Sequence, residues 1–223
     1  MKIRFVTRES VSSFGERLRE ADADVLLFPL FDEVVVNYEE ELRGESGYFE
    51  EAAILSKEAK CVVVCGYTTS THGILRSSAL VAERGRILGV SDALTSVDGD
   101  KNCGAYLKVY DTQCGRVGVA VGADAYVPEI FRTLSACGSE YVLCLFGANA
   151  DGTERILLRA AALSYGVPVC LCAKGYAFVA DTDGETAFSS PYSPVCFSME
   201  KNGEYHLAEY RLRGFKKRDG GKY

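Results

Sequence analysis

The sequence has few histidines and no cysteines in the closely spaced Cys-x-x-Cys arrangement. Only His72 and His206 occur among the 223 residues, although there are nine cysteines. Structural zinc sites use Cys and His ligands in short, paired spacings, so no metal site is predicted. The shortage also argues against a Ser-His-Asp hydrolase, although His72, in a Thr-His-Gly segment, stays open as a single candidate.

Other absences narrow the class of protein further. No apolar run approaches the roughly 20 residues that span a bilayer, and Met1–Val6 lacks the features of a signal peptide. The net charge of −6 argues against nucleic-acid binding. Gly220-Gly221 lacks the strand-to-helix context of a phosphate-binding loop, so no cofactor is predicted. The cysteines lie mostly in apolar runs, where reduced thiols behave as small hydrophobes. We therefore expect a cytoplasmic protein that contacts neither membranes nor nucleic acid.

What is present is a 48% hydrophobic chain in which apolar strand-like runs alternate with segments of helical periodicity. Helices interleaved with strands on both sides of a hairpin-rich centre predict a layered α/β sandwich, in one domain over residues 1–223. The predicted strands are Lys2–Val6, Val25–Phe28, Cys61–Gly66, Ser77–Glu83, Arg86–Gly89, Tyr106–Asp111, Val117–Val121, Tyr141–Phe146, Val167–Ala173, Pro194–Met199 and Tyr205–Arg211, the last two forming a hairpin. The predicted helices cover Val11–Ala21, Phe49–Leu55, Pro128 to Gly138, and Thr153–Tyr165.

The order of several segments resembles the nitrilase (carbon–nitrogen hydrolase) superfamily almost from end to end. The segments that carry the resemblance are Ala23–Pro29, Ser78–Gly89, Val109–Val121, Asp124 with Val127–Arg132, Leu158–Ala162, and Ser193–Val195 through Asn202-Gly203. Each segment is weakly specific alone, whereas their order and spacing together are specific. The resemblance implies a four-layer α-β-β-α sandwich.

The resemblance also implies a site whose chemistry is missing. The family uses a glutamate base, a lysine and a cysteine nucleophile, which together activate the thiol and support a tetrahedral intermediate. At the matching positions this chain has Leu30, Ala93 (or Asp92 if the register shifts by one) and Gly122. Leucine, alanine and glycine cannot transfer a proton or attack a carbonyl. We expect the three positions to converge in space without acting as catalytic residues, and Asp124 to support the adjacent loop.

The sequence is compatible with three functions. The first hypothesis is a non-catalytic module with a degenerate triad that binds a small molecule or another protein. The alternative is an amide or nitrile hydrolase with a relocated site built from Cys144, Glu33 and Lys174. The competing interpretation of these residues is a buried thiol, a residue of a solvated loop and a surface lysine, and it is the favoured one for Cys144 and Glu33. A third hypothesis is a structural subunit of a larger assembly.

A homodimer is the expected assembly because the resemblance implies one. The segments Val127–Phe131 and Tyr210–Phe215 are the candidates for the contact, since relatives use both for pairing. Phe131 and Phe215 are large apolar groups of the kind that bury well at interfaces.

Overall fold

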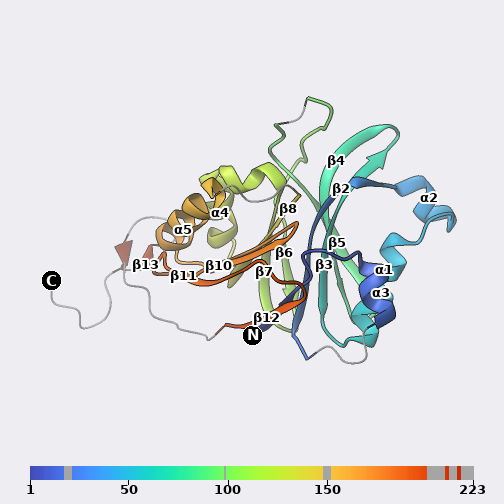
Figure 1. The fold of residues 1–223 in the computed structure, drawn as a ribbon. Helices are drawn as coiled ribbons and strands as arrows, with labels where there is room; N and C mark the ends of the chain where they lie inside the picture. Colours follow the sequence, from blue (N-terminus) through green and yellow to red (C-terminus); the bar gives the residue numbers. More distant parts are fainter. Residues whose placement is uncertain (18–21, 98, 148–151, 200–208, 211–214, 217–223) are drawn as a thin grey trace.

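Two six-stranded sheets packed face to face form the centre of the molecule, and helices cover the outer face of each (Figure 1). The computed structural model describes residues 1–17, 22–97, 99–147, 152–199, 209–210 and 215–216. The elements are β1 (Lys2–Phe5), α1 (Val11–Arg17), β2 (Val25–Asn37), α2 (Tyr38–Arg43), α3 (Tyr48–Glu58), β3 (Val62–Thr71), β4 (Ile74–Glu83), β5 (Arg86–Asp92), β6 (Val109–Thr112), β7 (Gly115–Val121), the 3-10 helix η1 (Gly122–Tyr126), α4 (Pro128–Ala136), β8 (Tyr141–Phe146), α5 (Thr153–Tyr165), β9 (Val169–Ala173), β10 (Tyr176–Ala180), β11 (Thr186–Ser190), β12 (Val195–Ser198), β13 (Glu209–Tyr210) and β14 (Phe215–Lys216).

The two sheets have the same plan. Their strand orders are β12-β1-β2-β3-β4-β5 and β11-β10-β9-β8-β7-β6. In each, three central strands are parallel and the outer strands are antiparallel. The parallel crossovers run through α1 and α3 in the first sheet and through α4 and α5 in the second. This is the predicted α-β-β-α sandwich.

The core explains why the central strands are apolar on both faces. Along β8, Leu143 and Leu145 face the other sheet, whereas Val142 and Cys144 belong to the cluster beneath α4 and α5. A strand covered on both sides must be apolar at every position, and all six residues of β8 are buried. The long apolar runs of the sequence are therefore the strands between the sheet interface and the helices.

Some predicted boundaries and pairings were wrong. The chain does not enter a loop after Phe28, because β2 continues to Asn37 and stays paired with β3 through two register shifts. The strand before β7 begins at Val109 and not at Tyr106. Strands β10 and β11 and helix α2 were not predicted, since each is short and bounded by turns.

The predicted C-terminal hairpin is described only in part. Strand β12 pairs antiparallel with β1, which lies some 190 residues earlier in the chain, as in Lys2 opposite Ser198. Most of its predicted partner, Tyr205–Arg211, lies outside the described residues, as does the end of the first predicted helix beyond Arg17. None of the described helices is both long enough and apolar enough to cross a membrane.

Candidate functional site

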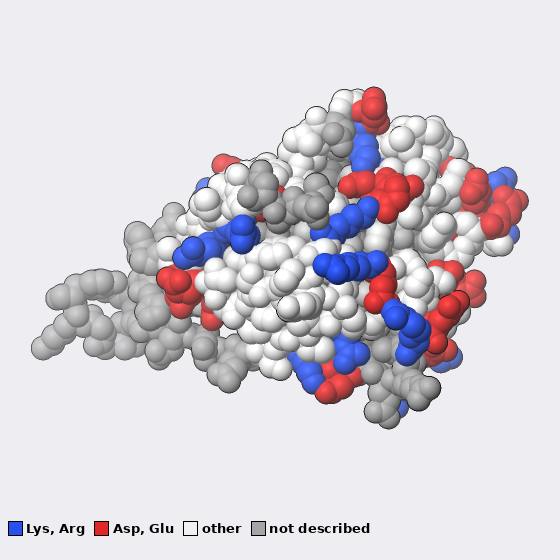
Figure 2. All heavy atoms as spheres, in the orientation of Figure 1, with Lys and Arg blue, Asp and Glu red and all other residues white. Residues whose placement is uncertain are grey.

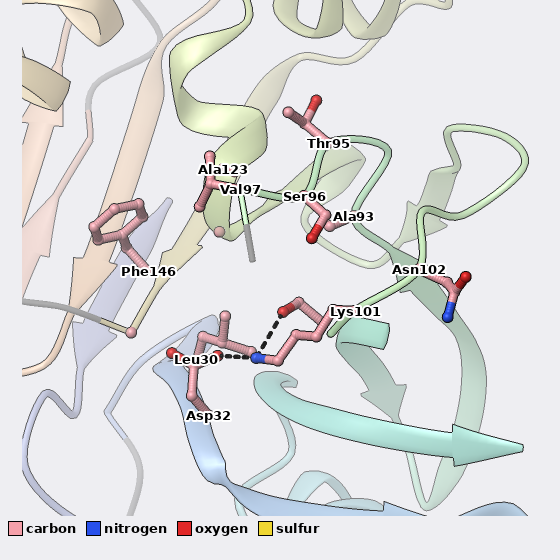
Figure 3. Close-up of a pocket in the computed structure, with 13 residues that line it drawn as sticks. Leu30, Asp32, Ala93, Thr95, Ser96, Val97, Lys101, Asn102, Ala123 and Phe146 are labelled. Atoms are coloured by element: carbon pink, nitrogen blue, oxygen red, sulfur yellow. Dashed lines mark hydrogen bonds and ion pairs between the residues drawn. The ribbon is translucent and has the colours of Figure 1, made fainter. Parts of the chain in front are cut away.

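Leu30, Ala93 and Gly122 come together around one cavity of about 230 Å³ (Figure 3). Leu30 belongs to β2, Ala93 follows β5, and Gly122 begins η1 directly after β7. Gly122 and Gly147, which directly follow the parallel strands β7 and β8, place this side of the cavity at the carboxyl ends of parallel strands, where α/β sheets commonly have ligand sites. Its walls are Leu30, Asp32, Ser77, Ala93, Thr95, Ser96, Val97, Lys101, Asn102, Gly122, Ala123, Phe146 and Gly147.

Gly122 leaves the position at the end of β7 without a side chain. Its φ of +56° is left-handed, a conformation that glycine adopts without steric cost. A Cβ built on Gly122 would meet only Leu30 Cδ2, at 3.5 Å. There is thus space for a larger residue here, but the chain places no nucleophile in it.

Asp124 ties two walls of the cavity together. Its Oδ1 accepts hydrogen bonds from the backbone N–H groups of Leu94 at 3.0 Å and Thr95 at 2.9 Å. Its Oδ2 accepts one from Val121 at 3.3 Å. Burial raises the pKa of Asp124 to about 6, although these hydrogen bonds act in the opposite direction. The carboxyl group holds the loop after β5 against the turn after β7, which is the supporting role expected for it.

A carboxylate and an ammonium group that the sequence did not single out lie inside the cavity. Lys101 Nζ donates to Asp32 Oδ1 at 2.9 Å and to Ser77 Oγ at 3.3 Å, as the dashed lines in Figure 3 mark. The Lys101 side chain is only 16% exposed. Asp32 lies two residues beyond Leu30 and so on the same face of β2. This alternation along the strand indicates the place of Asp32 only once β2 is known to continue past Phe28.

Gly147 fixes the position of Asp32. A Cβ on Gly147 would overlap Asp32 Oδ2, so the carboxylate lies directly against the backbone at the end of β8. A side chain at this position would displace Asp32 from Lys101. The absence of a side chain at residue 147 is therefore part of the cavity's construction.

The residues of the alternative, relocated site do not come together. Cys144 is fully buried in the cluster beneath α4 and α5, and burial raises the pKa of its thiol far above the usual range. Glu33 and Lys174 do form an ion pair, at 2.6 Å, and this hydrogen bond lowers the pKa of Glu33. However, Glu33 lines a groove on the opposite face of β2 from the cavity. The thiol and the ion pair thus lie apart from each other and outside the cavity.

The remaining candidates that the structure describes also lie away from the cavity. His72 is in the turn between β3 and β4, where its side chain is largely exposed and faces Glu39; His206 is outside the described residues. Phe131, a predicted dimer contact, is 1% exposed and packs in the core beneath α4. Of Tyr210–Phe215, residues 211–214 are not described. Within the described ranges, no group of three His, Cys, Asp or Glu side chains is placed to hold a metal ion.

Comparisons with known proteins bear on the fold. No protein-family model and no curated protein sequence matches the chain. Among solved structures, an amidase of the nitrilase superfamily from Nesterenkonia AN1 superposes with a TM-score of 0.72 at 16% identity, over 88% of both chains. The fold is that of the nitrilase superfamily.

A second solved structure agrees. Saccharomyces cerevisiae Nit3, a member of branch 10 of the nitrilase superfamily, superposes with a TM-score of 0.72 at 15% identity, over 88% of both chains. Other structures of the Nesterenkonia amidase hold butyramide, or the acetamide moiety of fluoroacetamide added covalently to the active-site cysteine. At these identities the likeness establishes the shared architecture of the two-sheet sandwich.

Proposed function

We propose that this nitrilase-fold protein binds a small polar ligand in the cavity beside Gly122 and does not hydrolyse carbon–nitrogen bonds. The observation that carries the proposal is the composition of the wall. Leu30, Ala93 and Gly122 meet there, and none of the described residues that line the cavity is a cysteine. Cleavage by this family's chemistry requires a nucleophile together with a base, and these three positions supply neither.

The hydroxyl of Ser77 does not replace the missing thiol. A serine nucleophile requires a neighbouring base to take its proton. The neighbouring nitrogen, Lys101 Nζ, donates to Asp32 Oδ1 at 2.9 Å and to Ser77 Oγ at 3.3 Å. In this arrangement Lys101 is the hydrogen-bond donor and the Ser77 oxygen is the acceptor, which is the reverse of the contact that a base would make with a serine nucleophile.

The polar groups that remain fit a small ligand with both a donor and an acceptor. Asp32 offers a carboxylate oxygen and Lys101 an ammonium group, within a cavity of about 230 Å³. That volume is below the roughly 300–1,000 Å³ of sites for drug-sized ligands. A short primary amide has the required size and both kinds of polar atom, and butyramide is the bound molecule in one structure of the Nesterenkonia amidase.

Binding of short primary amides tests the ligand part of the proposal. We expect titration with butyramide to shift the NMR signals of Ala93, Ala123 and Gly122. Asp32→Asn should weaken binding about fivefold or more, because the charge-assisted contact is lost. The matched control is Glu33→Gln, which changes the next residue of β2 on its opposite face. Spectra that do not respond to any amide, or equal weakening by both variants, would contradict the proposal.

We also propose that the protein is a homodimer that pairs through the outer face of α5. Ile156, Ala160 and Leu163 are exposed at helical spacing on this helix, and Ile156 is 70% exposed. Such a stripe is of the kind that a second copy covers. Sedimentation at micromolar concentration should give a dimer that Ile156→Asp dissociates and that Ile54→Asp, on α3, leaves intact. A monomer of the unaltered protein would contradict the proposal.

A further inference from the structure

A larger groove lies on the other side of β2 from the cavity. Its volume is about 690 Å³, and it is bounded by the start of α1, by β2 and by the start of α3. Successive residues of a strand point to opposite faces, so Leu30 and Asp32 line the cavity whereas Phe31 and Glu33 line the groove. The groove is thus a separate site with its own chemistry, and its size is typical of ligand pockets.

One wall of the groove is a continuous row of aromatic rings. The ring centroids of Phe31 and Tyr67 are 6.2 Å apart, and those of Tyr67 and Tyr48 are 5.7 Å apart. Phe31 and Tyr67 are buried, whereas Tyr48, the first residue of α3, is 38% exposed. The faces of aromatic rings carry partial negative charge and attract cations.

The rim of the groove carries more negative than positive charge. Glu33, Glu45 and Glu51 line it, and among its described lining residues Arg8 is the single cation. Glu33 is paired with Lys174, Glu45 with Arg43, and Arg8 donates to the carbonyl oxygen of Pro191. The excess negative charge therefore lies at Glu51.

The surroundings of Glu51 add to this negative charge. Partial burial, together with the like charges of Glu41 and Glu16, raises the pKa of Glu51. Figure 2 shows acidic side chains on the side of the molecule formed by α2 and α3. A ligand with a positive charge would relieve this repulsion, whereas an anion would increase it.

We propose that this groove binds a small organic cation, an alkylammonium ion whose charged group lies against Tyr48 and Tyr67 near Glu51. The rings supply cation–π attraction and a low-polarity surface for the alkyl groups, and the carboxylate supplies charge complementarity. The cavity beside Gly122 differs in both respects, because it has a single aromatic ring, Phe146, and a carboxylate already paired with Lys101.

Calorimetric titration with choline, a quaternary ammonium ion, tests the proposal directly. The matched neutral probe is 3,3-dimethyl-1-butanol, which has the same shape without the charge. We expect choline to bind and the neutral probe to bind at least about tenfold more weakly. Tyr48→Leu and Glu51→Gln should each weaken choline binding about threefold to tenfold. Both positions are partly exposed, so circular dichroism should confirm that the two variants fold.

Two controls separate this site from the rest of the molecule. Tyr106→Leu removes a ring that is 62% exposed elsewhere, and Asp32→Asn changes the cavity on the opposite face of β2. Neither should alter choline binding. Absence of choline binding at millimolar concentration, equal binding of the neutral probe, or equal weakening by Tyr106→Leu would overturn the proposal. Because Asp32→Asn affects only the cavity, failure here is distinguishable from failure of the amide-binding proposal.

Discussion

Two neighbouring residues of β2 form ion pairs on opposite faces of the strand, and the two pairs differ in their surroundings. Asp32 and Lys101 are 2.9 Å apart in the cavity, whereas Glu33 and Lys174 are 2.6 Å apart at the rim of the groove. The Lys101 side chain is 16% exposed, and that of Lys174 is 39% exposed. Because water screens exposed charges strongly, we expect the Asp32–Lys101 pair, although it is the longer one, to contribute more to the free energy of unfolding.

This difference explains what each face of β2 is able to do. On the cavity side, Lys101 is largely buried, and Asp32, whose side chain is 44% exposed, lies against the backbone of Gly147 at the end of β8. On the groove side, the Glu33 pair lies in solvent, and the buried groups are the rings of Phe31 and Tyr67. One strand thus separates a small polar cavity from a larger aromatic groove.

The largest effect that we expect on the cavity side comes from Asp124. Its pKa of about 6 in the folded protein is above its ordinary value of 3.8, so the folded state binds more protons between these values. The contribution of Asp124 to the free energy of unfolding therefore decreases as the pH rises through this range, by up to about 3 kcal/mol.

Urea unfolding of the unaltered protein and of Asp124→Asn across this pH range checks the expectation. Asparagine keeps an oxygen that can accept a hydrogen bond but does not titrate. The stability of the unaltered protein relative to the variant should fall as the pH rises. A relative stability that stays constant or rises would show that the carboxyl group is not protonated by burial as described.

A smaller effect is expected from Gly147→Ala. The added Cβ overlaps the carboxylate of Asp32, and such overpacking typically costs about 1–3 kcal/mol. Amide binding in the cavity should be lost, while choline binding in the groove is unchanged. Gly99→Ala is the control, since a Cβ there meets nothing within 4 Å. Intact amide binding in Gly147→Ala would mean that the position of Asp32 does not matter to the site.

The smallest effects compare the two lysines directly. Lys101→Met should lower the free energy of unfolding by about 1 kcal/mol because it leaves Asp32 unpaired in the cavity. Lys174→Met should change it by less than about 0.5 kcal/mol, as is usual for exposed pairs. Urea unfolding measures both, and equal effects would remove the distinction between the two faces of β2.

The fold could be predicted because its causes are local. The apolar runs Val25–Phe28 and Tyr141–Phe146 are central strands, and helical periodicity marked α3, α4 and α5. The pairing of β12 with β1 could not be predicted, because it joins the two ends of the sheet-forming chain. Such contacts depend on the assembled sandwich and leave no periodic signal.

The only parts of the site that could be predicted were the residues that the resemblance to the nitrilase superfamily indicated. It brought Leu30, Ala93 and Gly122 together correctly, but it gave no indication of Lys101. That lysine comes from the loop after β5, whose path depends on the hydrogen bonds from Leu94 and Thr95 to Asp124. Loop side chains placed by such distant contacts cannot be located from spacing along the sequence.

Ammonia release from short amides and nitriles is the measurement that tests the central claim most directly. We expect purified protein to release no more ammonia than a protein-free control, because none of the described residues that line the cavity is a cysteine, and Leu30, Ala93 and Gly122 can neither attack a carbonyl nor accept a proton. Cys144→Ala and Asp32→Asn should behave in the same way. Sustained turnover by the unaltered protein that disappears in either variant would contradict the account and establish a working hydrolase site.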